Sequence, residues 1–255
     1  MKIISYNVNG IRAAIRKGFL EWLSEEKPDI VCLQETKANP SQVPVAEIES
    51  LGYQTFWEVA TSKKGYSGVA IFTKPTPKKV TNGMGLSIYD QEGRVLRTDY
   101  DDFSVMSVYM PSGTMGEIRQ AFKMQWLSDF RSYIDELKQE KKHLIISGDY
   151  NICHRPIDIH DPIRNKNTTG FLPEERAWIS EFIDSGFIDT FRFFHLDQPD
   201  HYSWWSYRAG ARARNLGWRI DYHMASVSLQ DRLVSASLLP EVHHSDHCPV
   251  VLEIR

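Results

Sequence analysis

Short apolar segments recur along this chain, and a cluster of polar residues stands directly beside each one. Residues 30–37 read IVCLQETK, residues 144–151 read LIISGDYN, and residues 242–254 read VHHSDHCPVVLEI. Apolar runs of this length predict strands that are buried on both faces. Such strands need a covering layer on each side, so the pattern predicts packed β-sheets flanked by helices.

Hydrophobic periodicity predicts where the remaining elements lie. Apolar residues at helical spacing predict helices over residues 11–26, 45–51, 117–141 and 173–184. Alternating or wholly apolar segments predict strands over residues 2–8, 30–33, 53–59, 68–72, 95–100, 103–110, 144–146, 190–194, 202–207, 218–225, 233–239 and 249–254. Residues 154–172 form a long polar segment without periodicity, which is typical of a functional or disordered loop. No linker or fixed-period repeat interrupts the pattern, so we expect residues 1–255 to form a single α/β domain.

The composition limits the partners that this chain can attract. With 30 Lys and Arg residues against 33 Asp and Glu residues, the formal net charge is −3, so a nucleic acid would need a local basic patch or metal ions. The three cysteines form no CxxC motif, which favours reduced core residues. No signal peptide or apolar stretch of membrane-spanning length is evident, so we expect a cytoplasmic protein without a membrane partner.

Polar residues gather at the ends of five predicted strands. These residues are Asn7, Glu35, Tyr109 with Ser112, Asp149 with Asn151, and Asp246 with His247. Carboxylate and amide oxygens are hard ligands that suit Mg²⁺ or Mn²⁺. Taken singly, each residue has a structural alternative: Asn7 and the segment 149–151 suit turns, and Tyr109 suits a core.

Asp221 lies inside an otherwise apolar predicted strand, where a carboxylate needs a partner. A pairing with His247 would fix the imidazole tautomer and stabilise its protonated form. A metal site beside such a pair predicts metal-assisted hydrolysis of a phosphate ester. Serine chemistry is disfavoured because the chain has no GxSxG motif.

Local positive charge is concentrated in residues 208–219, RAGARARNLGWR, which contain four arginines, Arg212 and Arg214 among them. This segment suits the phosphate backbone and the minor groove of a nucleic acid. Lys63 and Lys64 form a second basic candidate, although a charge pair of this kind is more often a solvated surface.

Five motifs in order over the whole chain closely resemble one family. They are SYNVNGIR at 5–12, PDIVCLQETK at 28–37, SGDYN at 147–151, GWRIDY at 217–222 and SDH at 245–247. The chain resembles the exonuclease III family of apurinic/apyrimidinic endonucleases, within the endonuclease/exonuclease/phosphatase superfamily. The resemblance implies a four-layered α/β sandwich of the DNase I-like type, in which two packed mixed β-sheets are flanked by helices.

The resemblance also implies a role for each motif residue. Glu35 matches the principal Mg²⁺ ligand, with Asn7 and Asp246 in the metal region. Asp149 and Asn151 match the positions that handle the attacking water and the scissile phosphate, and Tyr109 matches a phosphate-contacting tyrosine. His247 matches the active-site histidine, with Asp221 as its orienter. The residues that match the pocket or other substrate contacts are Trp204, Trp218, Ile220 and Asn165, with Ser112 standing where some relatives have a phosphate-contacting Asn.

The function so implied is Mg²⁺-dependent hydrolysis, with Mn²⁺ as a possible substitute, of the phosphodiester 5′ to an abasic site in duplex DNA. Trimming of blocked 3′ ends and 3′→5′ exonuclease activity would accompany it, in a monomer at the nucleoid. Two alternatives stay open: a phosphatase or phosphodiesterase acting on a non-DNA phosphoester, and a non-catalytic nucleic-acid-binding regulator. The balance of endonuclease and exonuclease activity, the number of metal ions, and the choice of Asp149 or His247 as general base also stay open at this point.

Overall fold

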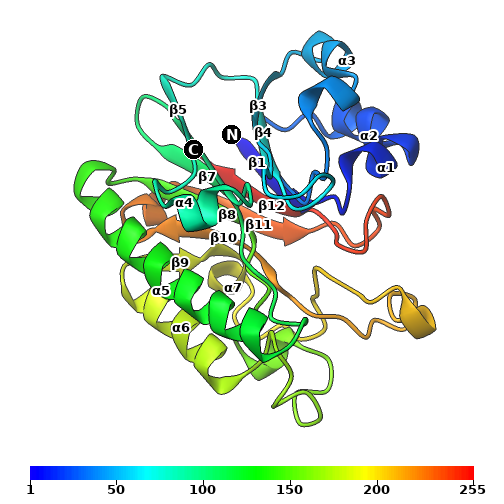
Figure 1. The fold of residues 1–255 in the computed structure, drawn as a ribbon, viewed down its shortest axis with the longest axis vertical. Helices are drawn as coiled ribbons and strands as arrows, with labels where there is room; N and C mark the ends of the chain where they lie inside the picture. Colours follow the sequence, from blue (N-terminus) through cyan, green and yellow to red (C-terminus); the bar gives the residue numbers. More distant parts are fainter.

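Two six-stranded β-sheets form the centre of the computed structural model, which describes residues 1–255 (Figure 1). The strands of the first sheet are β1 (Lys2–Asn7), β2 (Ile30–Gln34), β3 (Gln54–Glu58), β4 (Val69–Thr73), β11 (Leu233–Leu238) and β12 (Val250–Ile254). Those of the second are β5 (Lys79–Asn82), β6 (Val95–Asp99), β7 (Ser104–Tyr109), β8 (Leu144–Asp149), β9 (Phe187–Asp189) and β10 (Asp221–Ser226). The spatial orders are β11-β12-β1-β2-β4-β3 and β5-β6-β7-β8-β10-β9. Each sheet is mixed, because β1–β2 and β7–β8 pair in parallel and the other neighbours pair antiparallel.

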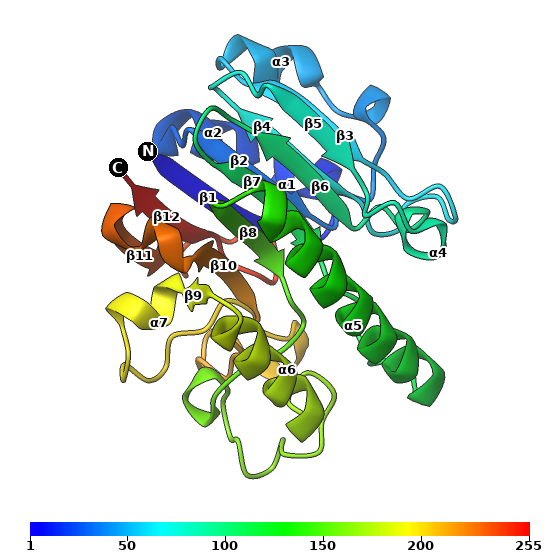
Figure 2. The same cartoon turned by 90° about the vertical axis from the view of Figure 1, so that its left-hand side faces the viewer.

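Helices cover the outer faces of the two sheets (Figures 1 and 2). The α-helices are α1 (Ile11–Arg16), α2 (Phe19–Glu26), α3 (Val45–Ser50), α4 (Ser87–Asp90), α5 (Glu117–Glu140), α6 (Pro173–Asp184) and α7 (Thr190–Phe194). Short 3₁₀ turns are η1 (Pro40–Gln42), η2 (Pro156–Asp158), η3 (Arg208–Gly210) and η4 (Val227–Arg232). No helix combines the length and the apolar character that crossing a bilayer would require.

Strand alternation produces the layers. Successive side chains of a strand point to opposite faces, so Ile3 of β1 packs between the sheets while Ile4 packs against the first helices. Helices α1 to α3 complete the core around Ile4, and α5 and α6 complete a third core around Ile146 of β8. The predicted two-sheet α/β sandwich is therefore confirmed.

The predicted helix over residues 11–26 is in fact two helices. The chain breaks at Gly18, whose φ of +94° lies in the left-handed region, and α2 starts directly after it. A glycine adopts this conformation without steric cost, which allows the sharp change of direction. Elements β5, α4 and β9 were not predicted.

Residues 187–221 differ most from the predicted secondary structure. The segment 190–194 was predicted as a strand but forms α7, whose first turn is capped by Asp189: its carboxylate accepts from the backbone N–H of Arg192 at 3.2 Å. The segment 202–207 forms only isolated bridges at Trp204, and β10 begins at Asp221 instead of residue 218. Aromatic and β-branched residues favour strands, but in these segments their side chains pack without the backbone joining a β-sheet.

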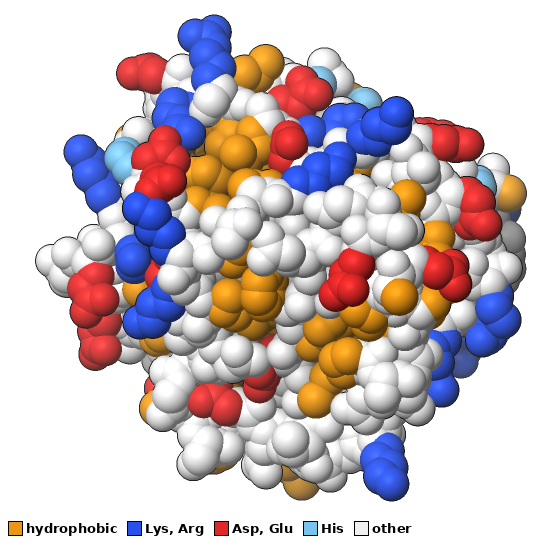
Figure 3. Space-filling model, turned by 90° about the horizontal axis from the view of Figure 1, so that it is seen from above, with side chains coloured by type: hydrophobic (Ala, Val, Ile, Leu, Met, Phe, Trp, Pro, Cys, Tyr) orange, Lys and Arg blue, Asp and Glu red, His pale blue; other side chains and the backbone are white.

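Charges of both signs are interspersed on the face seen in Figure 3, without a field of one sign. This distribution agrees with the net charge of −3. Attraction of a polyanion therefore has to arise locally.

The topology places six chain segments at one edge between the sheets. Strands β1, β2, β7 and β8 all end there, as parallel pairing requires. Strand β10 starts there, with Asp221 opposite Asp149. Strand β12 runs antiparallel to β1 with Val250 opposite Ser5, so the loop before it also lies at this edge. The site described next occupies this position.

Candidate active site

A buried asparagine links the carboxylates of the two sheets. The Asn7 side-chain amide donates to Glu35 Oε1 at 2.9 Å and to Asp149 Oδ2 at 2.8 Å, and Asn7 is fully buried. Burial raises the pKa of Asp149 to about 7, with a further rise from Asp221 and an opposing effect from His247. The cluster therefore has more negative charge than the surrounding protein neutralises.

The predicted pairing of Asp221 and His247 is present. His247 Nδ1 lies 2.9 Å from Asp221 Oδ2, which also accepts from the Ser203 hydroxyl at 2.6 Å. Burial alone lowers the pKa of His247, but the Asp221 carboxylate more than offsets this and raises it to about 10. At neutral pH the imidazole is thus protonated on both nitrogens, with Nε2 3.9 Å from Asp149 Oδ2.

An acidic cluster able to hold a metal ion lies at this point. Atoms of Glu35, Asp149 and His247 lie within 4.8 Å of one another, and the two carboxylates offer the ligand atoms because His247 is protonated. After burial, the charges of Asp221 and Glu35 also raise the pKa of Asp149, and a bound cation would reduce this repulsion. Oxygen donors of this kind fit a hard divalent cation. Lys37 Nζ, 2.7 Å from Glu35 Oε2, supplies part of the positive charge.

Asp246 lies beside this cluster and is held from two sides. Its Oδ1 accepts from the Asn9 amide at 2.9 Å, and its Oδ2 accepts from the Trp204 indole N–H at 3.1 Å. Burial opposes ionisation of Asp246, but His247 and these donors lower its pKa. The carboxylate is therefore ionised and fixed in orientation.

The backbone is strained where the strands enter the site. Asn9, Glu35 and Asn151 have φ values of +44°, +50° and +53°. Left-handed conformations of non-glycine residues cost roughly 1–2 kcal/mol each. Hydrogen bonds hold them: the Asn151 N–H donates to Asp149 Oδ1 at 2.8 Å, and the Gly10 N–H donates to the Glu35 carbonyl at 2.7 Å. These three residues belong to the sequence motifs, although other non-glycine residues of the chain, such as Lys27 and Asp161, also have positive φ.

A cleft of about 410 Å³ opens beside the carboxylates. Trp204 and Trp218 form part of its wall in an edge-to-face arrangement, with ring centroids 5.9 Å apart, and Ile220 completes the apolar side. Its other lining residues are Glu35, Tyr109, Ser112, Thr114, Asp149, Asn151, Thr168, Thr169, Gly170, Asp246 and His247. The structure thus brings most of the predicted residues together, with Asn7 and Asp221 hydrogen-bonded behind them.

Tyr109 is supported by an arginine that the sequence analysis missed. Arg94 donates to the Tyr109 carbonyl at 2.9 Å, and its guanidinium lies 4.8 Å from the centre of the Tyr109 ring. Burial, and then the Glu35 charge, raise the pKa of Tyr109 well above its usual value, and Arg94 opposes this. The phenol therefore stays neutral and can donate a hydrogen bond. Arg94 belongs to no motif, so no sequence signal pointed to it.

Three predicted substrate-binding residues lie outside the cleft. The Asn165 amide donates to the carbonyls of His160 and Asp161, both at 3.0 Å, and so folds its own loop. The guanidinium of Arg212 donates to backbone carbonyls, and Arg214 is exposed. From the loop of Asn165, the cleft is instead lined by residues 168–170.

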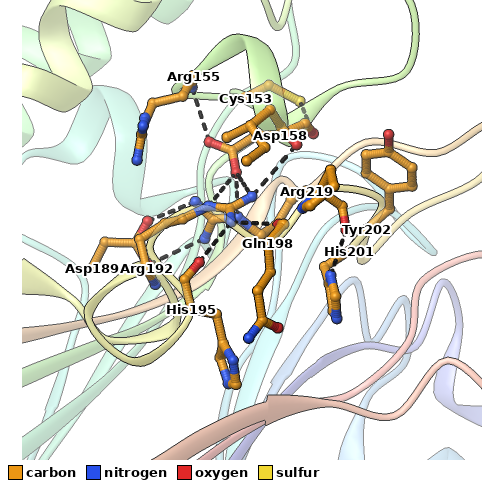
Figure 4. Close-up of polar contacts among 12 residues, drawn as sticks. Cys153, Arg155, Asp158, Asp189, Arg192, His195, Gln198, His201, Tyr202 and Arg219 are labelled. Atoms are coloured by element: carbon orange, nitrogen blue, oxygen red, sulfur yellow. Dashed lines mark hydrogen bonds and ion pairs between the residues drawn. The ribbon is translucent and has the colours of Figure 1, made fainter.

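Arg219 was predicted to belong to the basic DNA-facing segment, and this is wrong. It is fully buried and donates to Asp158 at 2.8 Å and to Asp189 at 2.6 Å (Figure 4). The reason is alternation: Trp218 and Ile220 point into the cleft, so the residue between them points to the opposite side. Arg219 therefore anchors the cleft wall from behind.

Two mixed sheets with an acidic and imidazole cluster at their common edge define a hydrolase of the DNase I-like fold. The chain belongs to the Endonuclease/Exonuclease/phosphatase family, whose sequence model matches residues 4–247. This confirms the resemblance inferred from the five motifs.

Relatives and solved structures match over the whole chain. An exodeoxyribonuclease of Bacillus subtilis (strain 168) is 48% identical over 255 residues, which cover 100% of this chain and 99% of that protein. The DNA repair nuclease APEX1 of Danio rerio is 39% identical over 99% of this chain and 81% of its own. An AP endonuclease from Archaeoglobus fulgidus superposes with a TM-score of 0.90 at 32% identity, covering 100% of this chain and 99% of that one. A 3′ phosphatase from Neisseria bound to a product DNA hairpin superposes with a TM-score of 0.92 at 27% identity, with the same coverage. The chain is accordingly a hydrolytic nuclease of DNA repair.

Proposed function

We propose that this nuclease hydrolyses the phosphodiester 5′ to an abasic site in duplex DNA, with Mg²⁺ as its cofactor, and that it also trims blocked 3′ ends. The observation that supports this most directly is the aromatic cleft of Trp204 and Trp218 beside the cluster of Glu35, Asp149 and His247. The similarity to an AP endonuclease and to a 3′ phosphatase supports both parts of the proposal.

The cleft wall favours a sugar without a base. Most of this wall is apolar surface from Trp204, Trp218 and Ile220. The indole N–H of Trp204 already donates to Asp246. An abasic deoxyribose has no pairing to break when it leaves the helix, which makes its extrusion less costly than that of an intact nucleotide. A base would gain few hydrogen bonds against this wall.

We propose Glu35 as the principal metal-holding residue, with Asn7 and Asp246 in the metal region. Bound Mg²⁺ would supply a positive charge that stabilises the developing charge on a phosphate oxygen. Mn²⁺ has similar ligand preferences and is expected to substitute.

The protonation states of the side chains indicate which of them would donate a proton or hydrogen bond and which would accept a proton. His247 has a pKa of about 10, because Asp221 overcomes the effect of burial, so its imidazolium is suited to donate to a phosphate oxygen and not to accept a proton. Asp149, whose pKa burial raises to about 7, is suited to accept the proton of the attacking water. The neutral Tyr109 phenol can donate to the same phosphate, and Asn151 lies where it can orient the water.

The DNA backbone would be contacted by exposed positive charge beside the cleft. Arg208 and Arg214 are exposed, and Tyr207, three positions after Trp204 of the cleft wall, has 69% of its surface exposed. We propose that residues 1–255 act as one domain and as a monomer, because both sheets contribute side chains to one site. This DNA substrate would place the protein at the nucleoid, in the cytoplasm.

The test uses a 5′-labelled duplex with one tetrahydrofuran abasic analogue, and the same duplex with an intact nucleotide as control. We expect incision at the analogue with Mg²⁺ or Mn²⁺ and none with EDTA. Glu35→Gln and His247→Asn are each expected to lower the rate by about 100-fold or more. Glu140→Gln, the same change at an exposed residue on the far end of α5, is expected to be neutral.

Each alternative has its own signature in this assay. Incision that persists in EDTA would contradict the metal assignment, and equal cutting of the intact duplex would contradict abasic specificity. An uncut duplex together with hydrolysis of a non-DNA phosphoester would favour the phosphatase. Binding of DNA without any hydrolysis would favour the regulator.

A further inference from the structure

The guanidinium of Arg212 is surrounded by backbone carbonyls of the loop between β11 and β12. One terminal nitrogen donates to the carbonyls of Pro240 at 2.8 Å and Val242 at 2.7 Å. The other donates to the carbonyls of Ser245 at 2.9 Å and His247 at 3.4 Å. A single side chain therefore connects four points along a segment that has no helix or strand of its own.

The geometry of this contact is specific to arginine. The planar fork directs two nitrogens to two pairs of acceptors, which the single ammonium of a lysine does not reproduce. The guanidinium also lies 4.6 Å from the centre of the Trp205 ring, so one face is fixed by stacking. Both terminal nitrogens of Arg212 donate within the protein and its Nε is buried without a partner, which leaves little capacity for a phosphate.

The loop that Arg212 holds contains Asp246 and His247. The backbone N–H of Trp205 donates to the Asp246 carbonyl at 3.0 Å, so the residue stacked on Arg212 holds the same loop. Displacement of this backbone would move His247 Nε2 relative to Asp149, which lies 3.9 Å away. A displacement of about 1 Å in a catalytic group can cost on the order of 100-fold in rate.

We propose that Arg212 is a positioning residue for the catalytic pair Asp246 and His247, and not a ligand of DNA phosphate. Arg214, two residues along the chain, is exposed and donates no side-chain hydrogen bond, which leaves it available for DNA. The inference rests on the nuclease function and on the proposed roles of Asp246 and His247. Arg212 and Arg214 thus have different roles, although neither residue type nor spacing distinguishes them in the sequence.

The two arginines supply matched variants. Arg212→Lys retains the charge and loses the fork, so we expect kcat on the abasic duplex to fall by about tenfold or more, with KM and its salt dependence unchanged. Arg16→Lys, the same change at an exposed residue outside both the cleft and the basic segment, should behave as the wild type. Arg214→Ala should raise KM and reduce the slope of log KM against log salt by about one, with kcat unchanged. Assays are run well below the unfolding temperature of each variant.

A second readout does not depend on activity. Backbone hydrogen exchange of the DNA-free protein should accelerate at least tenfold within residues 240–248 in Arg212→Lys, and should stay at the wild-type rate in Arg214→Lys. The Cys248 N–H, which donates to the Ser203 carbonyl at 2.7 Å, is a suitable probe. If the wild type fails to cut abasic DNA, the proposed function is wrong while this measurement still decides the position of the loop.

Three results would overturn the inference. The first is a wild-type kcat in Arg212→Lys, whether or not its unfolding temperature falls. The second is an Arg212→Ala variant that changes KM and the salt slope as Arg214→Ala does. The third is unchanged exchange across residues 240–248 in Arg212→Lys.

Discussion

Replacing Asp158 with Asn should test the buried ionic network behind the cleft wall. Asp158 Oδ1 accepts from Arg219 Nε at 2.8 Å and from two nitrogens of Arg192 at 2.9 and 2.7 Å (Figure 4). Its Oδ2 accepts from the Arg155 N–H at 2.9 Å. Asparagine keeps the shape and one acceptor but removes the charge, so Arg219 would keep Asp189 as its carboxylate partner and Arg192 would keep none.

The size of the effect follows from two independent arguments. Burial opposes ionisation of Asp158, but Arg219 and then Arg192 lower its pKa from 3.8 to about 2. The lowering of this pKa from 3.8 to about 2 corresponds to about 2 kcal/mol of stability. Removal of one partner from a buried ion pair costs roughly 3–5 kcal/mol. We therefore expect a loss of about 3 kcal/mol in the free energy of unfolding, or about 6–12 °C in the unfolding midpoint.

Urea denaturation at several pH values measures this difference, with Asp197→Asn as the control. Asp197 makes an exposed pair with Arg155 at 3.6 Å, so the same substitution there should cost less than about 1 kcal/mol. The folded pKa of Asp158 is depressed, so its contribution is complete above pH 3.8 and is lost as the pH falls through about 2. The gap between wild type and Asp158→Asn should thus be constant from neutral pH to about pH 5. A cost equal to that of Asp197→Asn, or a gap that widens below pH 4, would refute the reasoning.

Three further predictions concern other buried groups. Lys123→Met should lower the free energy of unfolding, measured in urea, by about 3–5 kcal/mol, because it leaves the fully buried Glu175, 2.6 Å away, without its ion-pair partner. Adding Glu175→Gln should recover at least half of this loss. In EDTA, the stability contributed by the Asp221–His247 pair should be complete below pH 6.5 and should disappear as the pH rises through about 10. If the free energy of unfolding of Asp221→Asn varied with pH as that of the wild type does, this prediction would be wrong. Gly148→Ala should lower the free energy of unfolding by about 3 kcal/mol or more, because the new Cβ would lie 1.9 Å from a carbonyl oxygen of β7. A melting temperature equal to that of the wild type would show that the two strands can move apart at no cost.

Local signals predicted the regular elements where packing and sequence preference agree. The helix over residues 173–184 has Pro at its first position and Glu in its first turn, and the structure begins and ends it at the same residues. The apolar runs of β2 and β8 were predicted correctly because burial on both faces requires such residues. The segment 190–194 failed because the Asp189 cap and the burial of Arg192 against Asp158 override its strand-like composition.

The candidate site was predictable to the extent that its residues lie in motifs. Asn7, Glu35 and Asp149 stand at strand ends, and strand ends meet at one edge of parallel pairs. Arg94 could not be predicted, because its contact with Tyr109 depends on antiparallel pairing of two strands and on the packing of its side chain. The same holds for Arg212, whose acceptors lie about 30 residues further along the chain.

The sequence by itself determined which chemical groups this protein can use: hard oxygen ligands, one imidazole with a carboxylate partner, and an aromatic wall. These follow from residue type and from position at the ends of apolar strands. Only the tertiary structure decided their ionisation and their tasks. Asn7 and Asp149 are 142 positions apart and meet at 2.8 Å, and the burial created there raises the pKa of Asp149 to about 7. Likewise, two arginines of the basic segment are exposed, one holds a loop and one is buried, because charge is local to the sequence while burial and hydrogen-bond partners belong to the fold.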